Sequence, residues 1–405
     1  MRTQNYSINR KLDPKARVDV DTRARLGFYT ICKQQSIFNI EPRTALSIYN
    51  DFVAKTKTTS HSDNVLRIVE KYNLRLIDIT SLAMATFKVP DLSNPEIRAR
   101  LPPSQHKEVA VMLLQGCAQA GDPLAIVHIL TVVYLGSLGN QPAQEIARLF
   151  PQKDIAQYRQ LLDTIDLQTL EKTPTLVVEV LTLRGLFLEQ AGQKQEAIKA
   201  YQEAIKPSTL NDQTGRPLTH AMQFPIIAPW NALGYLLKAD KDPKVQAEAQ
   251  SYFQKGALEG DDPLSYYELA AYEPKTSEKW LRYTSKAAAS GHRQAILDLT
   301  GFYQEVAASN SSVLENGSIR HALNWLLTWR RGSASKLARE WLHVASVVGH
   351  KPSMLQLAEY HKSIGHEEEY RNYLRMIVDS DSAALYKEEA PQLVQVARLR
   401  LAGTR

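Results

Sequence analysis

The sequence has few cysteines and no long hydrophobic run. Its two cysteines, Cys32 and Cys117, lie far apart in apolar surroundings, and neither belongs to a Cys-x-x-Cys pair. This pattern excludes a disulfide-stapled scaffold and a cysteine zinc site, and it predicts two buried, reduced thiols in a reducing compartment. No stretch approaches the roughly 18 consecutive apolar residues of a membrane span, so we predict no transmembrane segment.

Common catalytic and nucleotide-binding signatures are also missing. The sequence contains no G-x-x-x-x-G-K-[ST], G-x-G-x-x-G, G-x-S-x-G or H-E-x-x-H motif. These spacings place backbone amides, a nucleophile or metal ligands where the corresponding chemistry needs them. We therefore predict a protein that is not an enzyme and uses no cofactor, and we keep an enzyme built on a helical repeat as an alternative.

Histidines cluster in one part of the sequence. Four histidines lie close together in the sequence: His343, His350, His361 and His366. Their spacing fits no standard zinc motif, and the Gly-His pairs at 291–292 and 349–350 suit the end of a helix. The acidic run 367–369 is interpreted as a solvated helix start, favoured by the helix dipole. We therefore predict no metal site.

The composition is that of an ordinary globular protein with a mild positive charge. Hydrophobic residues make up 44% and charged residues 23%, and the net charge is +6 with a pI near 9.0. Such a charge permits a basic patch but does not require a nucleic-acid partner. Residues 1–20 are predicted to be an extended basic tail, because aspartates interrupt the basic residues and no apolar stripe is present. This segment matches a mitochondrial presequence poorly, and whether Met1 follows a removed presequence stays open.

The stretch from Trp230 to Tyr303 organises the rest of the chain. Trp230, Leu233 and Leu237 recur at helical spacing and share one helix face. Gly234 lies among them, and a glycine inside a helix costs about 1 kcal/mol relative to alanine, so we expect a neighbouring helix to pack closely there. Gly260 is predicted to end the second helix in a left-handed conformation, and the following Asp-Asp-Pro restarts a helix.

Similar features recur along the chain. An alanine precedes a turn glycine by eleven positions three times: Ala110 and Gly121, Ala249 and Gly260, and Ala338 and Gly349. Residues 174–207 carry Gly185, Ala197, Tyr201 and Ala204 at the spacing of a helix pair, with a turn at 192–194. The Trp-x-x-Leu-Gly start and these spacings resemble the tetratricopeptide repeat, and the segments 285–292 and 338–350 resemble its Sel1-like relatives. The resemblance covers roughly residues 101–365.

The resemblance implies an all-α, right-handed solenoid of stacked antiparallel helix pairs. We divide the chain into the tail 1–20, an N-terminal helical region 21–100 of divergent repeats or a cap, and a repeat solenoid 101–405. The boundary lies in the proline-rich stretch 89–104. Two turn-rich insertions, near 207–228 and 304–318, interrupt the solenoid.

The same resemblance implies a non-enzymatic scaffold or assembly factor for a larger complex, which holds an extended segment or a helix of a protein partner. The candidate partner-binding residues are Asn231, Tyr235, Trp325 and Trp329, although the tryptophans also have the spacing of core residues. An RNA-binding helical repeat of organellar gene expression is the alternative, although no base-reading position recurs between repeats. We expect an intracellular protein and favour the mitochondrial matrix over the cytosol, because the pI is high and secretory features are missing.

Overall fold

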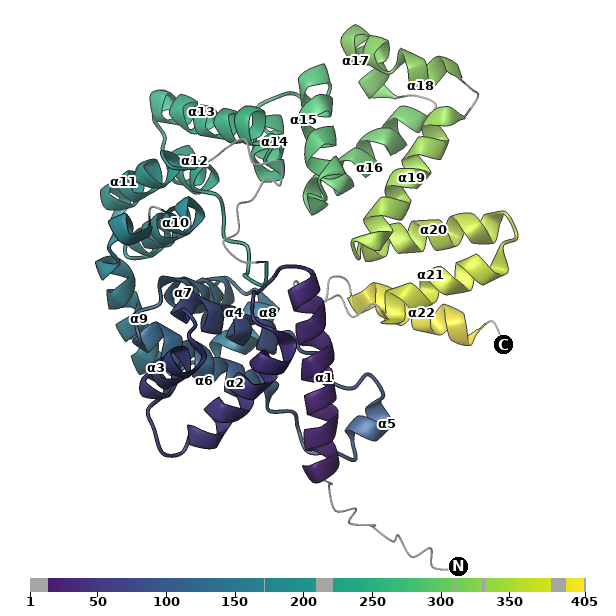
Figure 1. Cartoon of the computed structure of the whole chain (residues 1–405). Coiled ribbons are helices and arrows are strands. Elements are labelled where there is room, and N and C mark those ends of the chain that lie inside the picture. The colour runs from purple at the N-terminus through teal and green to yellow at the C-terminus, as the bar shows by residue number, and fades with distance from the viewer. Residues whose placement is uncertain are drawn as a thin grey trace, which may run out of the picture. The chain divides into compact units, whose positions relative to one another are not determined.

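The computed structural model of the 405-residue chain describes residues 14–170, 172–208, 221–308, 311–329, 332–379 and 391–403. These residues form 22 α-helices and two 3-10 helices and contain no strand (Figure 1), so the all-α prediction is confirmed. The chain divides into two compact units: unit 1 holds 1–137, 143–184 and 218–226, and unit 2 holds 138–142, 185–217 and 227–405. No described helix is both long and apolar enough to cross a bilayer.

Unit 1 is built around α4 (Leu76–Phe87), in which every residue from Ile79 to Phe87 is buried. A helix that is apolar on all sides belongs in the centre of a bundle, and α4 contacts α1, α3, α6 and α7. The unit also includes, wholly or in larger part, α1 (Pro14–Gln34), α2 (Pro42–Lys55), α3 (His61–Tyr72), α5 (Pro95–Arg98), α6 (His106–Gln119), α7 (Pro123–Ser137), α8 (Gln141–Ala147), α9 (Gln152–Thr164), η1 (Leu167–Leu170) and α10 (Pro174–Gln190).

In unit 2 most helices pack mainly on the next helix along the chain, whereas α16 packs mainly on α19. This order is visible from α12 to α16 and again from α19 to α22 (Figure 1). The helices are α11 (Lys194–Ile205), α12 (Pro229–Lys238), α13 (Pro243–Gly260), α14 (Pro263–Ala270), α15 (Glu278–Ala289), α16 (Arg293–Ala307), η2 (Ser312–Glu315), α17 (Gly317–Ala322), α18 (Asn324–Trp329), α19 (Ser333–Val347), α20 (Lys351–Ser363), α21 (Glu367–Asp379) and α22 (Pro391–Ala402).

Helix α1 begins earlier than the sequence pattern indicated. The predicted tail 1–20 is wrong for residues 14–20, which are helical, and residues 1–13 lie outside the described part. The reason is that the buried face of the first turns carries Arg17, Asp21 and Arg25 rather than apolar residues. Spacing of four residues places them on one helix face, but a search for an apolar stripe does not register a polar one.

The turns between helices repeat a left-handed residue followed by a helix start. Gly121 and Gly349 have φ values of +89° and +85°. The prediction for Gly260 is wrong: this residue is the last of α13, and Asp261 adopts the left-handed conformation with φ of +46°. The sequence 261–263, Asp-Asp-Pro, therefore corresponds to Gly-Asp-Pro at 121–123. The equal spacing of glycines placed the central turn one residue too early.

Two of these turns each contain a buried aspartate that connects neighbouring helices. Asp122 precedes α7 and accepts a hydrogen bond from the Ala125 amide at 3.2 Å and another from the Thr80 hydroxyl of α4. Asp262 precedes α14, accepts the Ser265 amide at 2.8 Å and accepts the Asn231 amide of α12 at 2.7 Å. Both aspartates are buried. Each one caps a helix and at the same time bonds to the first helix of the preceding hairpin.

Glycines in first helices make room for aromatic rings from second helices. A Cβ atom on Gly234 would lie 2.7 Å from the Phe253 ring, which confirms the close neighbour expected there. A Cβ atom on Gly185 would overlap the Tyr201 ring in the same way. The low helix propensity of glycine is therefore offset by close packing of the ring.

Of the two predicted insertions, the first lies largely outside the described residues and the second begins later than predicted. Of 207–228, residues 209–220 lie outside the described part, and α12 starts at Pro229 as expected. Residues 221–226 belong to unit 1, where Gln223 donates to the buried Glu179 carboxylate at 3.0 Å and Phe224 lies beside His128. The insertion at 304–318 starts too early in the prediction, because α16 continues to Ala307.

Candidate functional site

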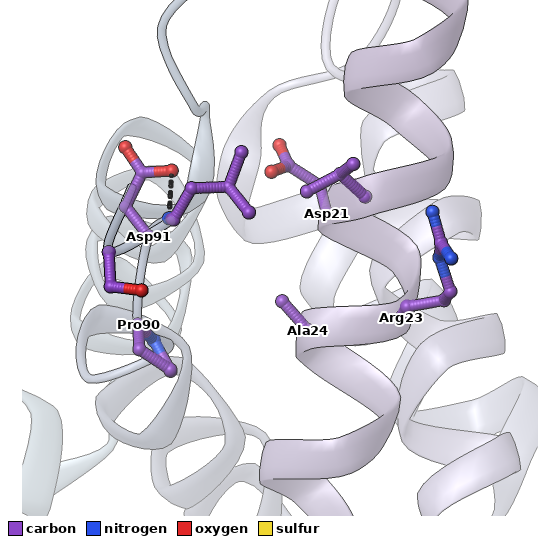
Figure 2. A pocket seen from close by; sticks show the side chains of 8 residues that line it. Asp21, Arg23, Ala24, Pro90 and Asp91 are labelled. Atoms are coloured by element: carbon purple, nitrogen blue, oxygen red, sulfur yellow. Dashed lines mark hydrogen bonds between the residues drawn. The ribbon is translucent and has the colours of Figure 1, made fainter. Parts of the chain in front are cut away.

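A pocket of about 460 Å³ opens between α1 and the segment 90–93 in unit 1 (Figure 2). Its lining is Val20, Asp21, Arg23 and Ala24 from α1 together with Pro90, Asp91, Leu92 and Ser93. Figure 2 shows Asp21 and Ala24 on the side of α1 that faces Pro90 and Asp91, whereas Arg23 points away from them. The pocket therefore combines apolar walls with two carboxylates.

A charge network joins the two walls of this pocket. The Arg17 Nη2 atom lies 2.8 Å from Asp21 Oδ1 and 2.7 Å from Asp91 Oδ1. Ser104 donates to Asp21 Oδ2 at 3.1 Å. Burial alone would raise the pKa of Asp91. Hydrogen bonds from Arg17 and the Leu92 amide outweigh this effect and hold the pKa below its usual range. Arg17 thus holds the segment that follows Val89 against α1.

The inner end of the network contains a neutral histidine. Arg25 Nη1 lies 3.3 Å from His106 Nδ1, so Nδ1 accepts and the ring proton is on Nε2, 3.6 Å from Asp21 Oδ1. Burial is the main cause that lowers the pKa of His106 to about 4. The positive charges of Arg25 and Arg17 act in the same direction, and the negative charge of Asp21 acts against them. The guanidinium of Arg25 also stacks over Tyr49 at 4.1 Å. With His106 neutral, two arginines balance two aspartates.

The pocket has one carboxylate oxygen that points outward. Asp91 is 38% exposed in its side chain, and Oδ1 accepts from both Arg17 and the Leu92 amide. Figure 2 shows the second oxygen of Asp91 outside the hydrogen bond to the Leu92 amide. This oxygen can accept a hydrogen bond from an amide or a basic group, while Val20, Ala24 and Pro90 offer apolar contact. The arrangement suits an apolar side chain with a neighbouring donor.

Asn231, the first predicted partner-binding residue, is 1% exposed. Its amide nitrogen donates to Asp262, and its carbonyl oxygen accepts from the Ser265 hydroxyl at 2.7 Å. Asn231 therefore holds the turn between α13 and α14, and its side chain is not at the surface where a partner could contact it.

Tyr235, the second predicted residue, is at the surface but already bonded. It is 37% exposed, and its hydroxyl donates to Glu268 Oε1 at 2.7 Å. Its ring meets Phe253 edge-on at 5.5 Å between centroids. Burial and the bond to Glu268 raise the pKa of Tyr235, so it stays neutral. Part of the residue remains exposed.

The predicted tryptophans differ from one another. Trp325 on α18 is 56% exposed. Trp341 on α19, which is not one of the candidates, packs on the unit 2 core and stacks with Tyr303 at 6.5 Å. Trp329 is the last residue of α18, and its side chain lies outside the described part. Of the candidate residues, Trp325 therefore offers the large exposed apolar side chain that a partner site needs.

Sequence reasoning missed the polar network on α1. The available signal was the Arg-Asp-Arg spacing of 17, 21 and 25, at intervals of four residues.

Comparisons with known proteins do not identify a family: no protein-family model matches the chain, and no curated protein shows significant similarity to it.

Proposed function

We propose that this chain is a helical-repeat scaffold of the tetratricopeptide and Sel1-like kind, a right-handed solenoid that holds a protein partner rather than catalysing a reaction. The observation that carries the proposal is that most unit 2 helices pack on the next helix along the chain, and that glycines of two first helices make room for aromatic rings in the same way. Such quasi-one-dimensional packing is typical of repeat proteins that present extended binding surfaces.

Two surfaces are the proposed contact points. In unit 1 the pocket beside Asp91 would take an apolar side chain and a neighbouring donor of an extended segment. In unit 2 the exposed Trp325 would anchor a second contact, since aromatic residues dominate binding energy at interfaces. Tyr235 supplies a further half-exposed ring.

We further propose that the partner belongs to a larger complex in the mitochondrial matrix. The pI near 9.0 and two buried cysteines without a disulfide support a reducing intracellular compartment. Imaging of the tagged full-length protein tests this placement, and an exclusively cytosolic signal would contradict it.

The interaction itself is tested by native purification of the tagged protein from its own cells. The sample is split into RNase-treated and untreated halves, and copurifying proteins are identified by mass spectrometry. We expect a discrete set of polypeptides that survives RNase. Partners that disappear with RNase would instead favour the RNA-binding alternative.

Three variants connect the partners to the two surfaces. Trp325→Ala removes the exposed ring, and Ser93→Trp fills the mouth of the pocket. Ser47→Trp, an equally large change at an exposed position of α2, is the matched control. We expect either or both of the first two variants to lose the RNase-resistant partners while the control keeps them. Retention of all partners by both variants would refute these contact points.

A further inference from the structure

The turn between α20 and α21 brings together side chains that bind transition metals. His361 lies in the last turn of α20, His366 directly precedes α21, and Glu369 lies in the first turn of α21. One nitrogen from each histidine and one Glu369 oxygen all lie within 4.8 Å of one another. His350 is not part of this group, and its Nδ1 lies 2.8 Å from the Ser353 hydroxyl.

The backbone of the turn fixes this arrangement. Gly365 has φ of +77°, which only glycine adopts readily, and it reverses the chain after Ser363. The His366 amide then donates to the His361 carbonyl at 2.9 Å. This bond closes the turn so that both imidazoles leave the chain on the same side, with ring centroids 5.8 Å apart.

His361 is held in place and keeps an unused nitrogen. Its ring stacks on Tyr373 at 5.6 Å, and the Tyr373 hydroxyl lies 2.7 Å from His343 Nδ1. His361 Nδ1 is buried and makes no hydrogen bond to the residues that the structure describes. A buried nitrogen without a partner is costly, and coordination of a metal ion would remove that cost.

From this geometry we infer that His361, His366 and Glu369 form a binding site for a divalent transition-metal ion of the zinc type. Two imidazole nitrogens and one carboxylate oxygen are the ligand set of open tetrahedral zinc sites, in which the fourth position stays free. Ligand atoms around zinc lie about 3.4 Å apart, given bonds of about 2.1 Å. Small side-chain rotations of the exposed His366 and Glu369 suffice to close the present spacing.

The ion would connect the end of α20 to the start of α21. Its positive charge would lie at the N-terminus of α21, where the helix dipole is unfavourable to cations, and the Glu369 carboxylate with its neighbours at 367–368 offsets this. The free coordination position would face solvent on the exposed side of the turn. A side chain of another protein could occupy it.

The experiment titrates the metal-free full-length protein with Zn²⁺ by calorimetry and with Co²⁺ by visible absorption. The variants are His366→Gln and Glu369→Gln, both exposed, and the control is His321→Gln, an exposed histidine of α17. We expect one ion per chain, the absorption of tetrahedral cobalt, and a higher melting temperature with Zn²⁺. Each variant should weaken binding by more than about tenfold, since loss of even an outer-shell partner costs roughly 10–100-fold.

The control variant should bind as the unaltered protein does. Circular dichroism in chelator must show the same helix content for all four proteins, which separates ligand loss from misfolding. Absence of Zn²⁺ binding to the unaltered protein would overturn the inference. Equal binding by the His366 and Glu369 variants and the control would overturn it as well, since the metal would then be held by scattered surface histidines.

Discussion

Replacement of Gly116 by alanine tests the packing of α6 on α3. A Cβ atom at this position would lie 2.5 Å from the His61 carbonyl oxygen, 2.9 Å from its carbonyl carbon and 2.7 Å from a Val65 methyl. Carbon and oxygen atoms normally approach no closer than about 3.3 Å, so α3 would have to move by about 0.8 Å. The obstacle is backbone, which cannot rotate away as a side chain can.

The expected magnitude follows from two opposing effects. Overpacking of this kind costs typically about 1–3 kcal/mol, and a backbone obstacle places the cost near the upper end. Alanine gains about 1 kcal/mol over glycine in a helix interior. We therefore expect Gly116→Ala to lower the free energy of unfolding of unit 1 by about 2 kcal/mol. Gly27→Ala in α1, where nothing lies within 4 Å, is the control and should gain up to about 1 kcal/mol.

The assay is denaturant unfolding followed by far-UV circular dichroism, with the transition of unit 1 resolved from that of unit 2. The difference between the two variants should reach about 3 kcal/mol. If Gly116→Ala is as stable as Gly27→Ala, the two helices do not approach as described, and the argument from close packing fails.

Two further changes are expected to alter stability in defined directions. His106 has its pKa lowered from 6.5 to about 4, so the unfolded chain binds the proton first and stability falls as the pH drops from 6.5 to 4. This loss amounts to about 3 kcal/mol, and His106→Gln should not show it; parallel pH curves of both proteins would contradict the buried neutral ring. Asp122, whose pKa burial raises to about 6, titrates over the same pH range in both proteins. Its contribution therefore cancels when the stability of His106→Gln is subtracted from that of the unaltered protein. Asp261→Gly should raise the free energy of unfolding by about 0.5–1 kcal/mol, because glycine adopts positive φ without strain, and an unchanged or lower value would contradict the left-handed conformation.

The helices of this chain were predictable because apolar residues recur at helical spacing. The region 21–100 was predicted to be helical and contains most of α1 together with α2 to α5, and the tight contact expected at Gly234 is filled by Phe253. The central turn was not predictable from glycine spacing alone. There the Asp-Pro pair at 262–263, which supplies the cap and the first helical residue, marks the helix start, and Asp261 replaces the turn glycine.

The candidate sites were harder to predict for two different physical reasons. The pocket depends on a helix whose buried face is charged, and such a face looks exposed in the sequence. The histidine cluster depends on a chain reversal at Gly365 that places His361 beside His366 and Glu369. The spacing of five residues fits no standard zinc motif within one helix, and it becomes a ligand spacing only after the turn is known.

The charged face of α1 fixes the first half of this helix in place, and ligand binding in the pocket is therefore coupled to the docking of α1. Ion pairs in buried positions contribute little net stability compared with apolar packing, but loss of one partner costs about 3–5 kcal/mol. Tyr29 and Cys32 anchor the second half of α1 in the core, whereas Arg17 and Asp21 hold the first half. Because α1 forms one wall of the pocket and Arg17 bonds to Asp91 on the other, a ligand in the pocket binds only the docked helix. Mass action then requires that such a ligand stabilise the docking of α1, so binding at the pocket and order in the N-terminal helix are linked in both directions.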